Sequence, residues 1–431
     1  MRVRSGMILV AALQLLESSR ADAQEAAPDE PVAVNVTPPA TPTEQAANAR
    51  LVAQPPEPLP RRGPMAAWVD GEGFRLESAD GNWKLRVGLQ VAFNYEPRFV
   101  TSGNNWSNFT FEYVRPRING TLFRPWIEYW CSFEFRQFPP FLLDCLLDVR
   151  PWKYFGIRAG QYWTPLSRHE YLGPQELVFP DWAPTADYFW TGRDRGVQLF
   201  GETDFIDWYA SFTAGTTLTQ TTTVPGNFQL QGRVSINPLG AVGPTEIPWI
   251  ATGKPVPFRF SFTLQGSWGR VNPNGVGFNS SDFLVLTQQG ERDYGLGGVD
   301  FLLQWNRFGF FSEFYGRRIS PRDVPTPSFT QYGAWAQAHY TFWRRALDAA
   351  VRFDWIQPSA SLAHDDFFSG EAQLAWFIYK TSLALRLRYG FAHQANPGAA
   401  PVNDPMFFTT VGLPITPGWL HLITLQIQLA I

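Results

Sequence analysis

The stretch KLRVGLQVAFNY, residues 84–95, alternates strictly between two kinds of side chain. Its odd positions, from Leu85 to Tyr95, are all apolar, whereas its even positions are polar or small. A period of two indicates a β-strand with two different faces. In a soluble sandwich the apolar face would form the core. In a membrane barrel the apolar face would meet lipid and the polar face would line a wet interior.

The composition is compatible with a membrane barrel. Of the 431 residues, 16% are aromatic and 17% are charged, compared with about 25% charged residues in average domains. No run approaches the roughly 18 apolar residues that a membrane helix needs, but alternating strands escape such a search. The formal net charge of −3 gives no indication of a nucleic-acid partner.

The N-terminal region predicts export. Residues 1–23 resemble a signal peptide, because Arg2 and Arg4 precede a short apolar stretch and an Ala-Asp-Ala cleavage site; an ordinary N-terminal helix is the alternative. Residues 24–67 are rich in Pro, Ala, Glu and Thr and are predicted to form a disordered periplasmic segment. The structured domain is expected at residues 68–431.

The alternating pattern returns along the whole of that domain. We expect sixteen strands, most of them longer than the ~5–6 residues of typical soluble strands. They are predicted at residues 84–95, 109–123, 126–135, 142–152, 155–163, 193–202, 206–214, 229–237, 258–269, 293–305, 308–318, 331–343, 347–356, 367–379, 382–391 and 420–431.

The connections between these strands favour an outer-membrane β-barrel. Short ones, such as 124–125 and 306–307, alternate with long ones, such as 164–192. Short turns on the periplasmic rim and long loops on the other rim are typical of outer-membrane barrels. Aromatic residues gather at strand ends, where a barrel places its interfacial girdles. The connection 238–257 departs from this rhythm, because it is long on the short-turn rim.

Four stretches occur in an informative order. They are GFRLESADGNWKLRVGLQVAFNY (73–95), VRPRINGTLF (114–123), GQYWTPLSRHE (160–170) and RDRGVQLFG (193–201). Together they resemble the phosphate-selective porin O and P family of Gram-negative outer membranes. The resemblance implies a sixteen-stranded, usually trimeric channel whose third loop folds into the pore and which prefers anions. Trp163 and Pro116 depart from the family's motifs, and its ladder of basic side chains does not map onto this chain residue by residue.

Charged side chains on the inward faces would set the selectivity of such a pore. The last strand closes on the first, so several basic residues are expected to form an arc on one wall, beside an acidic group on the next two strands (Glu128, Glu134, Asp144 and Asp148). The predicted pore-lining or anion-binding residues are Lys84, Arg86, Arg115, Arg117, Arg158, Arg386 and Arg388. Salt bridges that only rigidify the wall are the alternative role.

The only two cysteines, Cys131 and Cys145, lie symmetrically about Phe138. A symmetric hairpin would place them opposite each other on the lipid face. An exported protein can form a disulfide there, although two small lipid-facing thiols are also compatible. The same pairing would place Glu128 opposite Asp148, a like-charge pair that should attract a cation or favour protonation of one carboxylate.

The segment 164–192 is expected to fold inward or to form a surface loop. Ser167, His169 and Glu170 lie too close in sequence for the geometry of a catalytic triad, so an enzyme is disfavoured. No metal-ligand spacing or nucleotide motif predicts a cofactor. We expect a passive porin in outer-membrane lipid, a homotrimer by resemblance, for small anions such as phosphate or other small hydrophilic solutes. A general or carbohydrate-type porin and a closed barrel that displays binding loops are the alternatives.

Overall fold

The computed structural model describes residues 63–69, 73–100, 105–136, 139–189, 191–215, 226–243, 245–271, 292–322, 327–342, 346–360, 366–394 and 418–431. The predicted signal peptide and most of the predicted disordered segment lie outside these residues. The strands are β1 (Met65–Val69), β2 (Gly73–Glu77), β3 (Lys84–Val100), β4 (Trp106–Leu122), β5 (Arg124–Glu134), β6 (Phe141–Trp152), β7 (Phe155–Trp163), β8 (Arg193–Glu202), β9 (Ile206–Thr213), β10 (Phe228–Ile236), β11 (Arg259–Val271), β12 (Arg292–Trp305), β13 (Phe308–Pro321), β14 (Phe329–Phe342), β15 (Leu347–Gln357), β16 (Phe367–Tyr379), β17 (Leu383–Gln394) and β18 (Gly418–Ala430). The short helices are η1 (Pro174–Glu176), α3 (Pro184–Phe189) and α4 (Pro248–Thr252).

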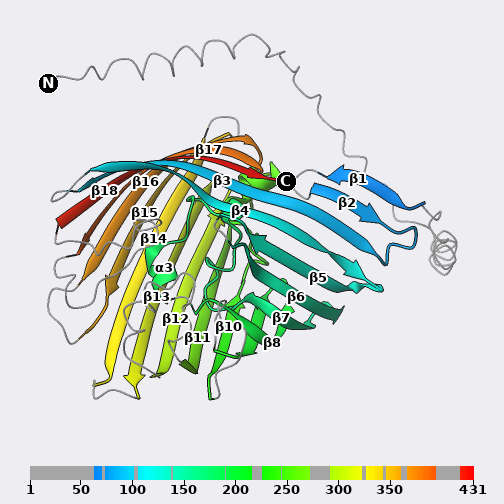
Figure 1. The fold of residues 1–431 in the computed structure, drawn as a ribbon, viewed down its shortest axis with the longest axis horizontal. Coiled ribbons are helices and arrows are strands. Elements are labelled where there is room, and N and C mark those ends of the chain that lie inside the picture. Colours follow the sequence, from blue (N-terminus) through cyan, green and yellow to red (C-terminus); the bar gives the residue numbers. More distant parts are fainter. Residues whose placement is uncertain are drawn as a thin grey trace, which may run out of the picture. The chain divides into compact units, whose positions relative to one another are not determined.

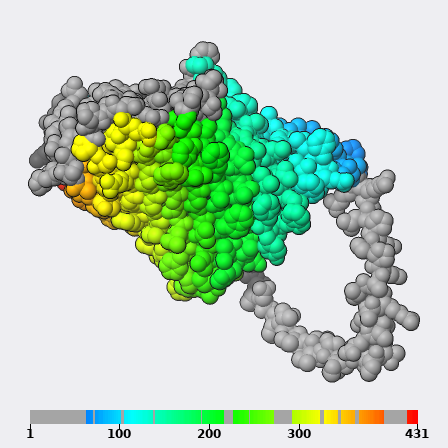
Figure 2. Space-filling model, turned by 90° about the horizontal axis from the view of Figure 1, so that it is seen from below, coloured from blue at the N-terminus to red at the C-terminus, as the bar shows by residue number. Residues whose placement is uncertain are grey.

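Strands β3 to β18 form a closed antiparallel barrel (Figure 1). Each strand pairs with the next one along the chain, and β18 closes on β3 with Leu425 opposite Tyr95. Figure 2 shows one outer face of the wall, where the strands succeed one another in sequence order. The predicted sixteen-stranded antiparallel barrel is thus confirmed.

A hairpin of β1 and β2, which was not predicted, extends the wall at one edge. β2 pairs with the first residues of β3, from Lys84 to Val87. β18 pairs with the same edge of β3 from Gln90 onward, where Ala430 is its last partner. The hairpin therefore continues the sheet past the C-terminus. It begins at Met65, slightly before the predicted start of the structured domain.

The faces of the strands are inverted relative to a soluble protein. In β11, the inward Thr263 is 2% exposed, whereas the outward Leu264 is 69% exposed. In β3, Asn94 is buried and its apolar neighbour Phe93 is partly exposed. The apolar positions of the opening stretch therefore face outward and the polar positions face the interior. Among the described residues, no helix is long and apolar enough to cross a membrane.

The two rims differ as the connection lengths predicted. Several short connections turn tightly with a residue of positive φ, namely Phe123 (63°), Asn306 (52°) and Lys380 (44°). We call this end the turn rim and the other end the loop rim. The connection between β10 and β11, which contains α4, is the long exception on the turn rim, and it turns into the barrel.

Cys131 on β5 and Cys145 on β6 lie opposite each other and form a disulfide, with their Cα atoms 4.2 Å apart. The symmetric hairpin predicted from the sequence is the reason for this pairing. We expect iodoacetamide to label neither cysteine in the denatured, unreduced protein and to label both after reduction with dithiothreitol. Mass spectrometry measures the labelling, and modification without prior reduction would contradict the bond.

Candidate functional site

The connection between β7 and β8, residues 164–192, lies inside the barrel, and we call it the crossing segment. Its ends are tied together, because the Thr164 hydroxyl donates to the Gly192 carbonyl oxygen at 2.7 Å. Its middle, from Leu177 to Phe179, is completely buried. Its helix α3 contacts β13, β14 and β15, and Figure 1 shows it within the ring of strands.

Arginines on the far wall hold the backbone of the crossing segment. Arg386 on β17 donates to the carbonyl oxygens of Phe179 (3.2 Å) and Leu177 (3.1 Å). Arg352 on β15 donates to the carbonyl oxygen of Asp181 at 3.0 Å. Irregular buried backbone must find hydrogen-bond partners outside itself. These side chains supply them and fix the path of the segment.

Arg386 and Arg388 were predicted to line the pore, and the structure buries both, Arg386 against the crossing segment and Arg388 among side chains of the wall. They are 1% and 2% exposed. Arg388 donates to Glu371 at 3.3 Å and to Thr424 at 2.9 Å. Their contacts therefore support the wall and the crossing segment rather than an open space.

The connection between β10 and β11 meets the crossing segment inside the barrel. The Glu246 amide donates to the Glu176 carbonyl oxygen at 3.0 Å, and the Thr245 hydroxyl donates to the same oxygen at 2.9 Å. In return, the Glu246 carboxylate accepts from the Val178 amide at 2.8 Å and lies 2.6 Å from His169 Nδ1. We call these five residues the Glu246 junction. It joins two segments that enter the barrel from opposite rims.

The protonation of the junction follows from its geometry. His169 Nε2 lies 2.8 Å from the Ala183 amide nitrogen and accepts its hydrogen, so Nδ1 carries the ring proton and donates it to Glu246. Burial tends to raise the pKa of Glu246, but interactions with His169, the Val178 amide and Gln337 outweigh it, and the pKa lies below its ordinary value. The carboxylate is therefore charged at neutral pH.

Apolar side chains fill much of the interior beside β12–β18. One cluster joins both inward segments to β15–β17, and its members are Val178, Phe179, Ile247, Trp249, Ile250, Ala350, Ala375, Phe377 and Ala384. A second cluster surrounds α3, where the rings of Phe189 and Tyr315 stack with centroids 5.2 Å apart. This half of the barrel is packed like a soluble core, which confines the larger open space to the other half.

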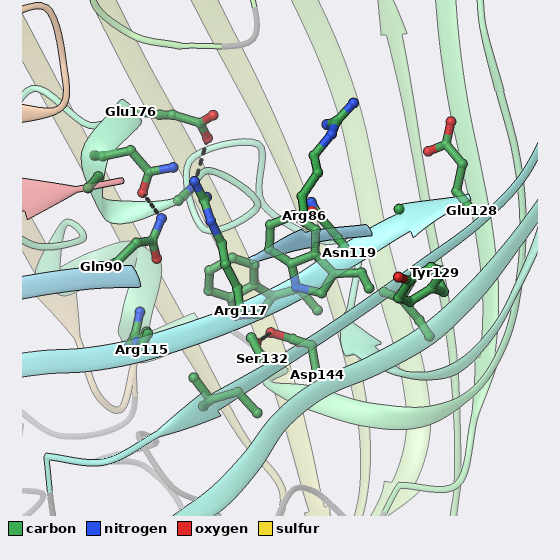
Figure 3. Close-up of a pocket in the computed structure, with 18 of the residues that line it drawn as sticks. Arg86, Gln90, Arg115, Arg117, Asn119, Glu128, Tyr129, Ser132, Asp144 and Glu176 are labelled. Atoms are coloured by element: carbon green, nitrogen blue, oxygen red, sulfur yellow. Dashed lines mark hydrogen bonds between the residues drawn. The ribbon is translucent and has the colours of Figure 1, made fainter. Parts of the chain in front are cut away.

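A cavity of about 750 Å³ lies between the crossing segment and the wall formed by β3–β8 (Figure 3). Six basic and four acidic residues line it: Lys84, Arg86, Arg115, Arg117, Arg158 and Arg193, with Glu128, Asp144, Asp148 and Glu176. The structure thus brings together five of the seven residues predicted to line a pore. Arg193 was missed because the alternation of RDRGVQLFG places it on the same side as the outward Val197 and Leu199.

Four of the basic residues are paired with carboxylates. The ion pairs are Arg158 with Asp148 (2.7 Å), Arg193 with Asp144 (2.9 Å), Arg115 with Glu134 (2.8 Å) and Lys84 with Glu77 (3.5 Å). Glu128 does lie opposite Asp148, as the hairpin predicted. The expected like-charge pair is nevertheless neutralised, because two nitrogens of Arg158 bond to Asp148.

Arg86 and Arg117 come from the adjacent strands β3 and β4 and point into the cavity (Figure 3). Glu176, on the crossing segment, lines the same cavity and accepts a hydrogen bond from the Gly173 amide at 2.9 Å. Burial raises the pKa of Glu176, while the Gly173 bond and the positive charge of Arg117 act in the opposite direction. A basic wall thus lies across the cavity from an acidic group, an arrangement that produces a transverse electric field.

Ser167, His169 and Glu170 have separate structural roles. The Ser167 hydroxyl donates to Glu313 at 2.9 Å, whereas His169 belongs to the Glu246 junction. Glu170 is 1% exposed. All three lie inside the packed crossing segment, away from the lining of the cavity. Within the described part of the chain, no cluster of His, Cys, Asp and Glu side chains is arranged to hold a metal ion.

No protein-family model matches this chain, and a comparison with curated proteins finds no match. The resemblance to the phosphate-selective family is therefore not confirmed. Solved structures match over most of the chain. An anion-selective porin from Comamonas acidovorans is 10% identical, covers 80% of this chain and 99% of its own, and superposes with a TM-score of 0.54.

Two further structures are similar in the same way. OmpT, an outer membrane protein of Vibrio cholerae solved in its trimer form, is 10% identical, covers 80% of this chain and 99% of its own, with a TM-score of 0.53. OmpF of Salmonella typhi, solved with daunomycin, is 9% identical, covers 81% of this chain and 98% of its own, with a TM-score of 0.52. At such identities the similarity shows that the chain has the porin-like barrel fold.

Proposed function

We propose that this chain is an outer-membrane channel through which small hydrophilic solutes diffuse passively, with a preference for small anions such as phosphate. The observation that carries the proposal is a basic-lined cavity inside a closed barrel whose outer face is apolar. An apolar outer wall is unfavourable in water and favourable in lipid. The similarity to outer-membrane barrels, two of them porins, supports this location.

The crossing segment would set the width of the channel. It leaves space beside β3–β8, so solutes would pass between Arg86 and Arg117 on the wall and Glu176 on the segment. Six basic and four acidic groups line this space, and an excess of one sign inside low-dielectric walls raises the local concentration of counter-ions. Anions are therefore expected to pass more readily than cations.

The finer parts of the proposal have separate support. The sequence motifs that resemble the phosphate-selective family favour phosphate as a solute. The trimer form of the Vibrio cholerae protein favours a homotrimer. The signal-like N-terminus favours export, and a channel of this kind would act without covalent chemistry or a cofactor.

Proteoliposome swelling and phosphate competition test this function. We expect the full-length protein to admit small sugars faster than large ones. In planar bilayers, phosphate added to a chloride solution should reduce the chloride current. A current that phosphate leaves unchanged would instead indicate a general porin, and a current reduced by sugars would indicate a carbohydrate-type porin.

A closed barrel that displays its long connections as binding surfaces is the second candidate. The observation that favours it is the extent of filling, because two inward segments and two apolar clusters occupy the interior beside β12–β18. Such a barrel would give neither swelling nor current in the same assays.

A further inference from the structure

A second cavity, of about 490 Å³, lies beside β8–β13. Tyr171, Glu176 and Thr245 line both this cavity and the larger one, so the two inward segments stand between the two spaces. Its volume falls within the range of about 300–1,000 Å³ that is usual for small-molecule sites. Residues of the turn rim form part of its lining, and Arg168 and Arg233 line it as well.

The carboxylates that line this cavity already have donors within the protein. At the turn rim, Arg150 pairs with Glu202 at 3.0 Å and Lys153 with Asp204 at 3.4 Å. Among the other acidic groups, Asp207 accepts a hydrogen bond from Asn237, and Glu176 accepts one from the Gly173 amide. Glu246 accepts hydrogen bonds from His169 and from the Val178 amide. These acidic groups are therefore engaged.

Arg233, on β10, is a buried cation whose direct contacts are with neutral groups. It is 5% exposed, and its Nη1 donates to the Ser167 carbonyl oxygen at 3.2 Å. Its guanidinium carbon lies 4.5 Å from the Tyr209 ring centroid and 5.1 Å from that of Tyr171. Its Nε has no hydrogen-bond acceptor, and among the ion pairs of the described residues none involves Arg233.

Arg168, on the crossing segment, is the second buried cation beside this cavity. Its Nη2 donates to the hydroxyls of Ser261 (2.8 Å) and Thr263 (3.1 Å). Its Nε lies 3.6 Å from Asp300 Oδ1 and has no hydrogen-bond acceptor. Asp300 interacts electrostatically with both Arg168 and Arg233. Asp300 is therefore shared between two buried guanidinium groups, and Arg233 has no ion pair of its own among the described residues.

We propose that the smaller cavity binds a small organic monocarboxylate. The carboxylate would lie on Arg233 and Arg168, because a guanidinium offers a planar pair of donors that matches a carboxylate. The apolar part of the ligand would contact Leu172, Leu302 and Phe311, which line the same space. This site is separate from the Arg86 and Arg117 wall and does not depend on conduction.

Isothermal titration calorimetry on the full chain in detergent tests the site, with benzoate as the probe. We expect benzoate to bind and its neutral isostere benzamide to bind at least about tenfold more weakly, since hydrogen bonds to charged groups have that strength. Arg233→Gln should weaken benzoate binding by about tenfold or more. Arg124→Gln, which removes one exposed guanidinium outside the lining of both cavities, is the matched control and should leave benzoate binding unchanged.

Folding of each variant is checked by the heat-dependent gel migration of a closed barrel. If Arg233→Gln does not fold, Arg233→Lys takes its place; it keeps the charge, loses the planar pair of donors and should weaken binding measurably. Failure of benzoate to bind the wild type, equal binding of benzamide, or an unchanged affinity in a folded Arg233 variant would overturn the proposal. Because binding in detergent needs no open channel, a failed conductance assay and a failed titration remain distinguishable.

Discussion

Replacing Glu246 by alanine is expected to raise the single-channel conductance and make the current noisier. The change removes the acceptor of the Val178 amide and of His169 Nδ1, both inside the barrel. A buried donor left without a partner costs about 1–3 kcal/mol, and about 1.4 kcal/mol corresponds to tenfold in an equilibrium constant. The population with a displaced crossing segment should therefore rise by about tenfold or more.

Two variants control for this effect. Glu246→Gln keeps one acceptor oxygen and should restore much of the wild-type conductance. Glu202→Ala removes a carboxylate that is 42% exposed at the turn rim and should leave the unit conductance unchanged. A Glu246→Ala channel that conducts like the wild type would show that the junction does not position the crossing segment.

Lowering the pH protonates the same carboxylate and provides a second test of the Glu246 junction. The pKa of Glu246 in the folded protein lies below its ordinary value of 4.5, so the stabilisation that its charged form gives to the folded state is complete above pH 4.5. This stabilisation is lost as the pH falls through the lower pKa of the folded state. Burial raises the pKa of Glu170 well above its ordinary value, and the neighbouring charge of Asp187 adds to this. Glu170 is therefore protonated at a higher pH than Glu246, and its neutral form costs less free energy to bury than its charged form. We expect a rise in conductance only below about pH 4.5, and Glu246→Gln should lack it.

Replacing both Arg86 and Arg117 by glutamate is expected to invert the ion preference from chloride to potassium. The lining of the larger cavity would change from six basic and four acidic groups to four and six. Charges that line a narrow space with low-dielectric walls dominate the local potential, so the sign of the reversal potential under a KCl gradient should change.

The control for this variant is a pair of exposed basic residues on short turns. Arg124→Glu with Lys380→Glu changes the net charge by the same amount, but both side chains are exposed and lie outside the lining of the cavity. This variant should keep the wild-type preference. If both double variants shift the reversal potential equally, the surface charge of the rim, rather than the cavity, controls selectivity.

The strands and their faces could be predicted because alternation is local. The pattern in residues 84–95 already separates inward from outward positions, and the symmetric spacing of Cys131 and Cys145 predicts their cross-strand pairing. Closure of the last strand on the first then brings Lys84, Arg86 and Arg117 to one wall. Each of these inferences needs only the period of a strand and the order of neighbours.

The interior could not be predicted, because its contacts join irregular segments that are distant in sequence. Arg386 looked like a pore residue on the inward face of its strand, yet it donates to carbonyl groups of the crossing segment. Glu246 lies in a connection without periodicity, and only the fold brings it to His169. The hairpin that begins at Met65 was missed because its short strands follow a Pro-rich stretch.

The most direct test of the central claim is the zero-current potential of the wild-type protein in a planar bilayer under a KCl gradient. We predict a measurable conductance and a potential that favours chloride, since the larger cavity would then be part of the ion pathway. A potential that favours potassium, or a barrel that inserts without conducting, would contradict the account.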